Sequence, residues 1–296
     1  MNRIIGIILI IISAASFGTL AIFGHYAFLN GMDTYTFLSL RFGISAVIML
    51  GLLYFRNETF PKGKTLLQLI GMGAVGYVGQ SYSYLTATRY ASAGLVALLL
   101  YLYPLMVALL SKIVFKEKIG KLKITALGIA LAGTMLTVSP EGGKLAGILL
   151  ALIAAIIYSV YIIVGTHVMR KISAFQSTSV IFASAGMVYL GLMFWTGPRM
   201  PSNSSGWLIV LGTILFATII PVVTFLAGLK RIGPTNASML STLEPVVTVL
   251  LASFMYGDFL PVVSLIGGAL ILASILLLTG SELFQARKPE PEGTPG

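Results

Sequence analysis

The sequence resembles itself at a constant offset of 141 residues. The clearest pair of segments is Tyr101-Leu102-Tyr103-Pro104 and Thr242-Leu243-Glu244-Pro245, and in each copy an acidic residue follows thirteen positions after the proline, Glu117 or Asp258. Further matches at this offset are Gly6 and Gly147, Phe17 and Tyr158, Gly24 and Gly165, Gly71 and Gly212, and Tyr84 and Phe225. A repeat of this length predicts a fold made from two copies of one unit.

Each copy contains five apolar segments of about 20 residues, the length that an α-helix needs to cross a bilayer. The predicted spans are 4–29, 35–55, 66–87, 91–114, 122–139, 145–168, 175–196, 207–229, 234–256 and 261–280. Because five is odd, the second copy must enter the membrane from the opposite side, as in the inverted repeats of many secondary transporters. We expect a first repeat over 1–140, an inverted second repeat over 141–280, and a disordered cytoplasmic tail over 281–296.

The composition supports a single integral membrane domain that is all α-helical. The chain is 57% hydrophobic and only 9% charged, whereas soluble domains carry roughly 25% charged residues. The first apolar run continues to about Leu29, which is longer than a signal peptide requires, so we expect an uncleaved span there. With no cysteine and two histidines at opposite membrane faces, we expect no disulfide, no metal and no cofactor.

The net charge of +10 does not indicate nucleic-acid binding, because the basic residues lie in short connectors between spans. One set of alternate connectors and ends holds fifteen of them: Arg3, Arg56, Lys62, Lys64, Lys112, Lys116, Lys118, Lys121, Lys123, Arg170, Lys171, Lys230, Arg231, Arg287 and Lys288. The other set holds three, Arg89, Lys144 and Arg199. The positive-inside rule then predicts that both termini are cytoplasmic, in a multi-pass protein of the inner (cytoplasmic) membrane.

The segment from Ser92 to Pro104 (SAGLVALLLYLYP), its counterpart LSTLEPVV from Leu240 to Val247, and Arg41-Phe42 resemble the EamA branch of the drug/metabolite transporter superfamily. The resemblance covers nearly all of 4–280. It implies ten helices around a central cavity lined by the first four spans of each copy, and alternating-access transport of small polar metabolites, amino acids or drugs. This chain has Phe17-Gly18 where the family usually has tryptophan and glycine, and Asp258 where it usually has glutamate.

Glu244 is the sharpest candidate for a functional residue. It lies ten residues after Pro234, about 15 Å into its span and close to the bilayer midplane. A carboxylate at that depth is costly unless it is paired, protonated or hydrated. We expect it to carry protons or to bind a substrate ammonium group; the alternative is a buried glutamate that only connects helices through Ser, Thr or Arg.

Arg41 is the one basic residue well inside a predicted span. Its long side chain could extend to the membrane surface or connect helices. Alternatively, its planar guanidinium could pair with Glu244 or with a substrate carboxylate and so take part in ion coupling.

A set of aromatic and polar residues completes the predicted substrate site around Glu244. Its members are Phe17, Thr19, Gln80, Tyr84, Tyr101, Tyr103, Tyr158 and Tyr161. Such a set suits an amino acid or aromatic metabolite, and tyrosine faces also suit a quaternary ammonium. Ordinary packing of amphipathic rings remains the alternative. Pro104, Pro221 and Pro245 lie within spans and should bend them, which makes them candidate gating residues. Glu117 and Asp258 fit either repeated helix-end contacts or a gating role.

These features predict a secondary transporter of small metabolites, amino acids or related compounds. Export is favoured, with proton coupling through Glu244. The alternative is an uptake carrier for a quaternary ammonium or other organic cation. An enzyme is not expected, because the spans lack HExxH, Gly-x-Ser-x-Gly and paired carboxylates. The chain shows neither the repeated polar ring of a channel nor a Walker motif. The expected partners are therefore a small-molecule substrate and the lipid bilayer, without an ATPase subunit; the oligomeric state stays open.

Overall fold

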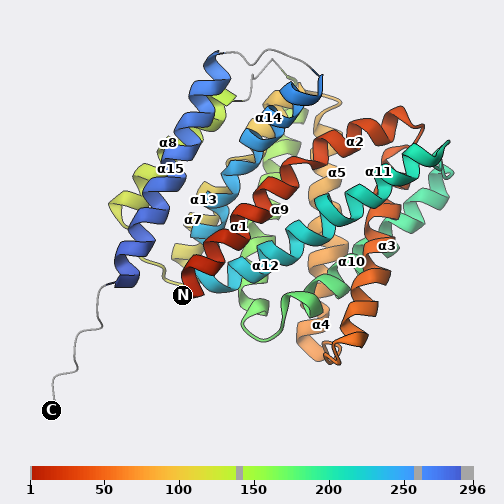
Figure 1. Cartoon of the computed structure of the whole chain (residues 1–296), viewed down its shortest axis with the longest axis horizontal. Helices are drawn as coiled ribbons and strands as arrows, with labels where there is room; N and C mark the ends of the chain where they lie inside the picture. Colours follow the sequence, from red (N-terminus) through yellow and green to blue (C-terminus); the bar gives the residue numbers. More distant parts are fainter. Residues whose placement is uncertain (1, 138–142, 257–261, 288–296) are drawn as a thin grey trace.

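The structure is a computed structural model that describes residues 2–137, 143–256 and 262–287. All the named elements of secondary structure in these residues are helices (Figure 1). The first half contains α1 (Asn2–Gly18), α2 (Leu20–Leu29), α3 (Thr34–Phe55), α4 (Gly63–Gly71), η1 (Met72–Tyr77), α5 (Val78–Ala87), α6 (Ala93–Leu100), α7 (Tyr103–Val114) and α8 (Lys121–Thr137). The second half contains α9 (Leu145–Met169), α10 (Ala174–Thr196), α11 (Ser204–Ile214), η2 (Leu215–Ile219), α12 (Ile220–Ile232), α13 (Pro234–Leu240), η3 (Ser241–Leu243), α14 (Glu244–Tyr256) and α15 (Val262–Arg287).

Helices from the two halves pack against each other in pairs. The most extensive contacts join α3 to α10, α8 to α15, α1 to α12 and α5 to α9. In Figure 1, α8 and α15 lie side by side at one edge of the bundle and α3 and α10 at the other. The core of buried apolar side chains therefore draws on both halves.

Eight helical segments of the described chain are long and apolar enough to cross a membrane: Asn2–Leu29, Thr34–Phe55, Leu95–Val114, Leu145–Met169, Ala174–Thr196, Ser204–Ile232, Pro234–Met255 and Val262–Gly280. The predicted spans 66–87 and 122–139 are also helical, as α4–η1–α5 and α8, but α8 has only 17 residues. At the other end, α15 continues to Arg287, so the predicted disordered tail does not begin at Ser281; residues 288–296 lie outside the described part.

Several spans change helical geometry near their middle. Short π-helical turns, η1 and η2, interrupt the third and eighth spans, and η3 is a 3-10 turn before α14. Pro221 and Pro245 are the second residues of α12 and α14, which follow η2 and η3. Pro104 is the second residue of α7, which follows the break between α6 and α7. A proline lacks the N–H that an uninterrupted helix would need, which explains these positions. The helices are thus interrupted beside the predicted prolines, whereas bending of the spans and gating stay predictions.

The α8–α15 pair is held close by glycines. A Cβ added at Gly133 would stand 2.7 Å from the Gly267 carbonyl oxygen, and one added at Gly267 would stand 2.6 Å from the Gly133 oxygen. Only glycine permits backbones to approach this closely. Between the same helices, the Ser274 hydroxyl donates to the Ala126 carbonyl at 2.8 Å.

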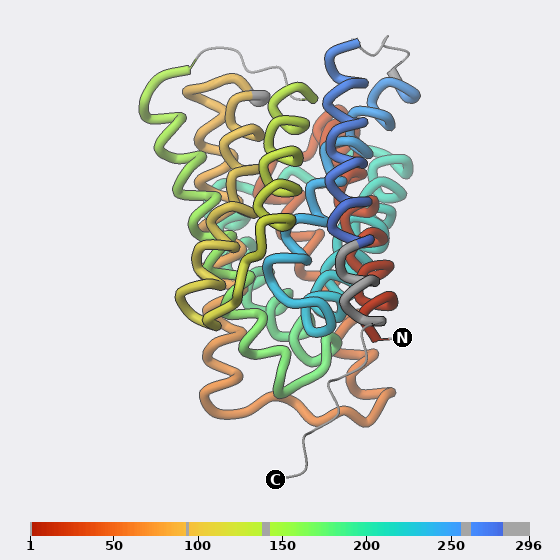
Figure 2. The backbone as a smooth tube through the Cα atoms, turned by 90° about the vertical axis from the view of Figure 1, so that its left-hand side faces the viewer, coloured from red at the N-terminus to blue at the C-terminus, as the bar shows by residue number. Residues whose placement is uncertain are grey.

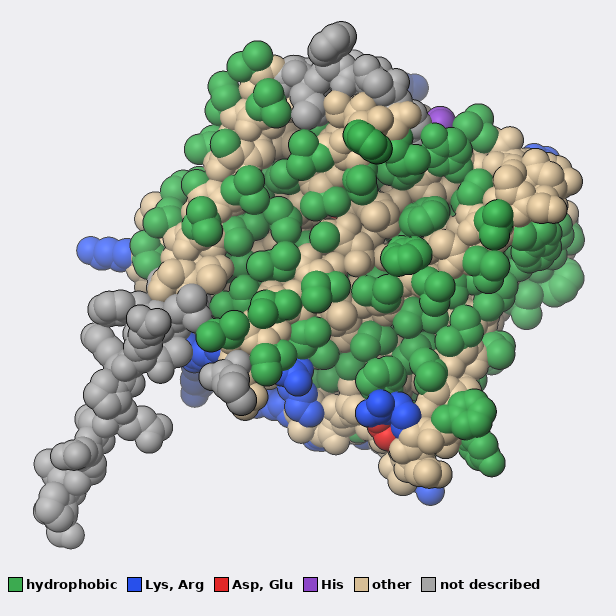
Figure 3. All heavy atoms as spheres, viewed as in Figure 1, with side chains coloured by type: hydrophobic (Ala, Val, Ile, Leu, Met, Phe, Trp, Pro, Cys, Tyr) green, Lys and Arg blue, Asp and Glu red, His purple; other side chains and the backbone are tan. Residues whose placement is uncertain are grey.

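The outer surface is largely apolar, and basic side chains lie along one end of the face shown in Figure 3. Large apolar side chains such as Val47, Val75 and Phe254 are 70%, 70% and 88% exposed, as expected for contact with lipid. Figure 3 shows hydrophobic side chains over most of one face and several Lys and Arg side chains along its lower edge. Figures 1 and 2 place the start of α1 at that end, where α15 also ends.

Candidate functional site

Glu244 is the first residue of α14 and the eleventh of the 22 residues in the apolar segment Pro234–Met255. It follows the 3-10 turn η3 and precedes Pro245, so the helix is interrupted where the carboxylate stands. Its side chain is half-buried. Within the described chain the carboxylate forms no ion pair and accepts no hydrogen bond, so it remains able to interact with a ligand or a proton.

Glu244 lies among side chains from both halves. Six of them interact with it electrostatically: Arg41, Tyr77, Tyr84, Tyr101, Tyr103 and Tyr158. We call Glu244 and these five tyrosines the Glu244 cluster. The structure thus brings together four of the predicted site tyrosines and adds Tyr77. Tyr84, Tyr158 and Glu244 all keep partly exposed surface.

Four tyrosine rings of the cluster, together with Tyr161, form a continuous series of contacts. Ring centroids are 6.4 Å apart for Tyr101 and Tyr103, and 4.7 Å for Tyr103 and Tyr158. The series continues through Tyr161, at 6.1 Å from Tyr158 and 5.7 Å from Tyr77. Edge-to-face and offset ring pairs of this kind each contribute about 0.5–1.5 kcal/mol, so the rings also stabilise one another.

Tyr103 and Ser159 connect the cluster to its surroundings. The Tyr103 hydroxyl donates to the Ser238 carbonyl at 3.4 Å, and the Ser159 hydroxyl donates to the Tyr103 carbonyl at 3.3 Å. Tyr103 precedes Glu244 by 141 residues, so the two occupy equivalent positions in the sequence repeat. A phenol and a carboxylate therefore stand at matching places in the two halves.

Arg41 is 4% exposed and does not reach the membrane surface. Its Nε donates to Thr218 Oγ1 at 2.7 Å, and its Nη2 donates to the Ala217 carbonyl at 2.9 Å, both in the π-helical turn η2. Its guanidinium carbon lies 4.9 Å from the centre of the Phe42 ring. The prediction that the Arg41 side chain extends to the membrane surface is therefore wrong, and the alternative that it connects helices is confirmed. Arg41 forms no ion pair with Glu244 in the described structure, and its part in ion coupling stays a prediction.

The first span reaches Glu244 through its backbone. A Cβ added at Gly18 would lie 3.0 Å from the Glu244 carbonyl oxygen, and the Thr248 hydroxyl donates to the Gly18 carbonyl at 3.0 Å. Phe17 and Thr19 flank this contact, at the interruption between α1 and α2. Phe17 is half-buried, and the Thr19 hydroxyl donates to the Ser16 carbonyl at 2.6 Å.

Gln80 and Tyr161 are placed less specifically. Gln80, in α5, is half-buried, and its Oε1 accepts a long bond of 3.4 Å from the Ser81 hydroxyl. The buried Tyr161 hydroxyl has no hydrogen-bond partner in the described structure. A buried hydroxyl without a partner is unfavourable, which is consistent with a ligand or water binding there. Substrate binding by both residues remains a prediction.

Sequence reasoning missed the partners of Arg41. Tyr77 is a further polar neighbour of Arg41, and Thr218 follows Tyr77 by 141 residues. Arg41 therefore interacts with equivalent positions of the two π-helical turns. The repeat offset could have paired Tyr77 with Thr218, but nothing in the sequence connects either residue to Arg41.

No group of His, Asp and Glu side chains in the described residues could hold a metal ion. His25 and His167 are both exposed. Glu117 makes helix-end contacts, accepting from Lys123 Nζ at 3.2 Å and from the Thr235 hydroxyl at 2.7 Å. Its predicted counterpart Asp258 lies outside the described residues.

The model of the EamA-like transporter family matches this chain twice, over residues 4–139 and 145–280. The chain belongs to the EamA-like transporter family. Both boundaries of the second match lie 141 residues after those of the first, the offset of the sequence repeat.

Related EamA proteins are described as transporters without a stated substrate. An uncharacterized transporter of Archaeoglobus fulgidus is 29% identical over 90% of this chain and 94% of its own length. The uncharacterized inner membrane transporter YedA of Escherichia coli is 25% identical, over 83% of this chain and 82% of its own length. One crystal structure, 21% identical, superposes with a TM-score of 0.81 over 94% of this chain and 98% of that chain, which shows the shared fold.

Proposed function

We propose that this EamA protein is a secondary transporter that moves small amine-bearing metabolites, amino acids or related compounds, by alternating access across the inner (cytoplasmic) membrane. Glu244 supports the proposal: its carboxylate, which has no ion-pair partner among the described residues, lies mid-span among tyrosines from both halves. An ammonium group at this position would be attracted both by the carboxylate charge and by the electron-rich faces of the tyrosine rings. We favour export as the direction of transport, driven by protons that bind Glu244.

The proposed movement uses two inverted five-helix repeats, 1–140 and 141–280, with both termini cytoplasmic. Two family matches in one register support the repeats, and the paired contacts between the halves support an interface along which they could rock. The basic side chains at the end where α1 begins support the orientation. With the two further helical segments α4–η1–α5 and α8, the chain would cross the membrane ten times.

The test uses purified protein in proteoliposomes, a panel of labelled amino acids and amines, and an imposed pH gradient. Glu244→Gln should lower flux roughly 30-fold or more, because losing a buried charged partner costs about 2 kcal/mol or more. Asp33→Asn is the control, since asparagine also caps a helix and can keep the bond from the Thr36 N–H that Asp33 accepts at 2.7 Å. Wild-type flux in Glu244→Gln would reject the role of Glu244, and flux insensitive to the gradient would reject proton coupling.

The second candidate is an uptake carrier for a quaternary ammonium or other organic cation. The five tyrosine rings of the Glu244 cluster support it, because ring faces attract cations that cannot donate hydrogen bonds. Choline separates the two candidates: strong competition by choline, with no competition by neutral amino acids, would favour the cation carrier.

A further inference from the structure

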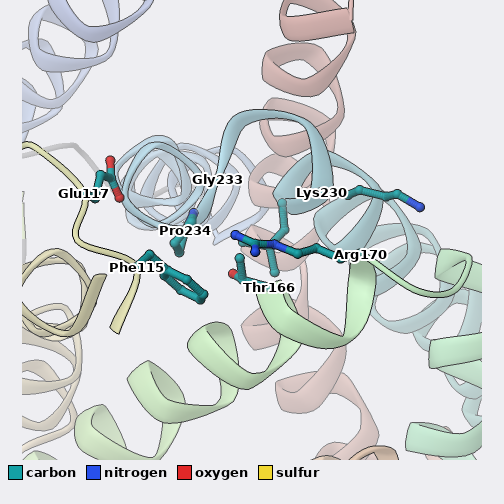
Figure 4. A pocket seen from close by; sticks show the side chains of 8 residues that line it. Phe115, Glu117, Thr166, Arg170, Lys230, Gly233 and Pro234 are labelled. Carbon is teal, nitrogen blue, oxygen red and sulfur yellow. The ribbon is translucent and has the colours of Figure 1, made fainter. Parts of the chain in front are cut away.

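A second polar site lies at the end of the bundle where α9 and α12 end and α13 begins. It is a pocket of about 270 Å³ (Figure 4). Its lining residues are Phe115, Glu117, Thr166, Arg170, Leu229, Lys230, Gly233 and Pro234. The volume is close to the lower limit for small-molecule sites, so it suits a ligand of about amino-acid size.

Arg170 is the charged group that reaches into this pocket. Figure 4 shows its side chain extending from the end of α9 toward Phe115 and Pro234. The guanidinium carbon lies 5.3 Å from the centre of the Phe115 ring. Within the described chain, Arg170 forms no ion pair and its guanidinium donates no hydrogen bond. The planar N–H fork is therefore available to an anion.

The other charged lining residues already have partners. The Lys230 ammonium points away from the pocket in Figure 4 and donates to the Ile172 carbonyl at 3.3 Å. Glu117 stands at the opposite rim, where Lys123 and Thr235 bind its two carboxylate oxygens. Neither residue neutralises Arg170.

The rest of the lining is suited to an apolar group. Phe115, Leu229 and Pro234 supply apolar surface beside the guanidinium. The Thr166 hydroxyl donates to its own helix, to the Ile162 carbonyl at 2.9 Å, and so is not a free donor for an anion. A ligand with one carboxylate and a small apolar side chain matches this arrangement, because Arg forms paired, charge-assisted hydrogen bonds with carboxylates.

We propose that this pocket is a cytoplasmic binding subsite for small carboxylates with an apolar side chain, and that Arg170 determines its specificity for the carboxylate. The inference rests on the proposed function in one respect, since it makes the pocket the inner entrance of the transport path. The helices of the pocket support that placement: α7 and α9 also carry Tyr103 and Tyr158, and α13 leads through η3 to Glu244. A substrate with both groups, an amino acid, would meet Arg170 first and Glu244 deeper in the membrane.

The experiment measures ligand-induced thermal stabilisation of the purified full chain in detergent, at probe concentrations up to about 10 mM. The probes are leucine, isocaproate (the carboxylate without the amine), leucinamide (the amine without the carboxylate) and inorganic phosphate. Isocaproate and leucine should stabilise the wild type. In Arg170→Gln their apparent affinity should fall about tenfold or more, the loss expected for a charge-assisted bond, while leucinamide is unaffected. Arg170→Lys should recover only part of the affinity.

Arg231→Gln is the matched control, because this arginine lies at the same end of the bundle, outside the pocket, and donates to the Ala227 carbonyl of its own helix. It should bind isocaproate like the wild type. Adding an anionic lipid to the micelles tests whether Arg170 binds a lipid headgroup instead of a free carboxylate. The proposal would be overturned if only that lipid stabilised the protein, or if phosphate stabilised it as strongly as isocaproate does. It would also be overturned if neither carboxylate stabilised the wild type, or if Arg170→Gln bound isocaproate with unchanged affinity.

Glu244→Gln separates this inference from the proposed function. If the subsite is real, Glu244→Gln still binds isocaproate with wild-type affinity. Isocaproate binding without flux of any probe in proteoliposomes would reject the transporter and leave the subsite standing. Flux of leucine with an unchanged cytoplasmic KM in Arg170→Gln would reject the subsite and leave the transporter standing.

Discussion

Arg41 is a buried charge that contacts no acidic side chain in the described part of the chain. Its two hydrogen bonds go to a hydroxyl and a carbonyl of η2, and its remaining surroundings include the face of Phe42. Glu244 interacts with it at longer range. Because these bonds use Nε and Nη2, much of the guanidinium fork is committed to connecting α3 with η2.

A double-mutant cycle tests this connection. Arg41→Met should lower the free energy of unfolding by about 3 kcal/mol, since each hydrogen bond from a charged donor contributes about 1.5–3 kcal/mol. Thr218→Val should cost less, and the two changes should couple by about 1–2 kcal/mol, as expected for residues in contact. The measurement is denaturant unfolding in detergent. Strict additivity of the two variants would contradict the connection.

The sequence could identify Arg41 as unusual but not its partners. A lone arginine in an apolar span must find polar groups, and this follows from solvation alone. Its partners lie 176 and 177 residues away, and the Ala217 carbonyl belongs to a backbone that any residue could supply. For the same reason the residues around Glu244 could be nominated by type, while their contacts required the fold.

At the scale of the elements, the π-helical turn η1 packs against α10 through a glycine. A Cβ added at Gly73 would stand 2.0 Å from Ser184 Oγ and 2.4 Å from the Ile181 carbonyl oxygen. Gly71, two residues earlier at the end of α4, has no atom of the described residues within 4 Å of the corresponding point. Of these two glycines, only Gly73 therefore lies at a close contact between helices.

This pair supplies its own control. Gly73→Ala should lower the free energy of unfolding by about 1–3 kcal/mol, because the added methyl group must displace backbone as well as a side chain. Gly71→Ala should be neutral or stabilising by up to about 1 kcal/mol, since alanine favours helix over glycine. Thermal unfolding of both variants in one detergent checks this. Equal effects of the two substitutions would argue against the close η1–α10 contact.

Helix interruptions were predictable only where proline marks them. Pro104, Pro221 and Pro245 predicted three of these interruptions. The interruption between α1 and α2 contains no proline, while α9 runs unbroken from Leu145 to Met169 at the equivalent place. This difference depends on tertiary packing, because Gly18 lies against the Glu244 backbone. The apolar periodicity of the sequence does not predict this contact or the interruption beside it.

At the scale of the whole molecule, a polar clamp joins the two halves at the end where α4 and α10 begin. The Ser173 hydroxyl caps α10 and donates to Glu58, and Gln176 Nε2 donates to the Thr59 carbonyl at 2.6 Å. Arg56 pairs with Glu58 at 3.0 Å. The hydrogen bond from Ser173, helped by Arg56, holds the pKa of the Glu58 carboxyl below its ordinary value.

The clamp makes stability depend on pH. Because the folded pKa of Glu58 is lowered, its contribution is present above the unfolded value of about 4.3 and is lost as pH falls through the folded pKa. The wild type should therefore have a higher Tm than Glu58→Gln near neutral pH, and the difference should shrink as the solution is acidified below about pH 4. Thermal unfolding from neutral to acidic pH checks this, with Asp33→Asn as control. A difference that does not change with pH would contradict the clamp.

The equivalence of Tyr103 and Glu244 has a consequence for how such a chain can arise. An ancestor assembled from two identical half-length polypeptides would place the same residue at both positions, either two phenols or two carboxylates. Gene duplication with fusion removes that restriction, because each half can then mutate alone. A single acid at mid-depth therefore requires two halves that differ in sequence at this position, as they do in this chain.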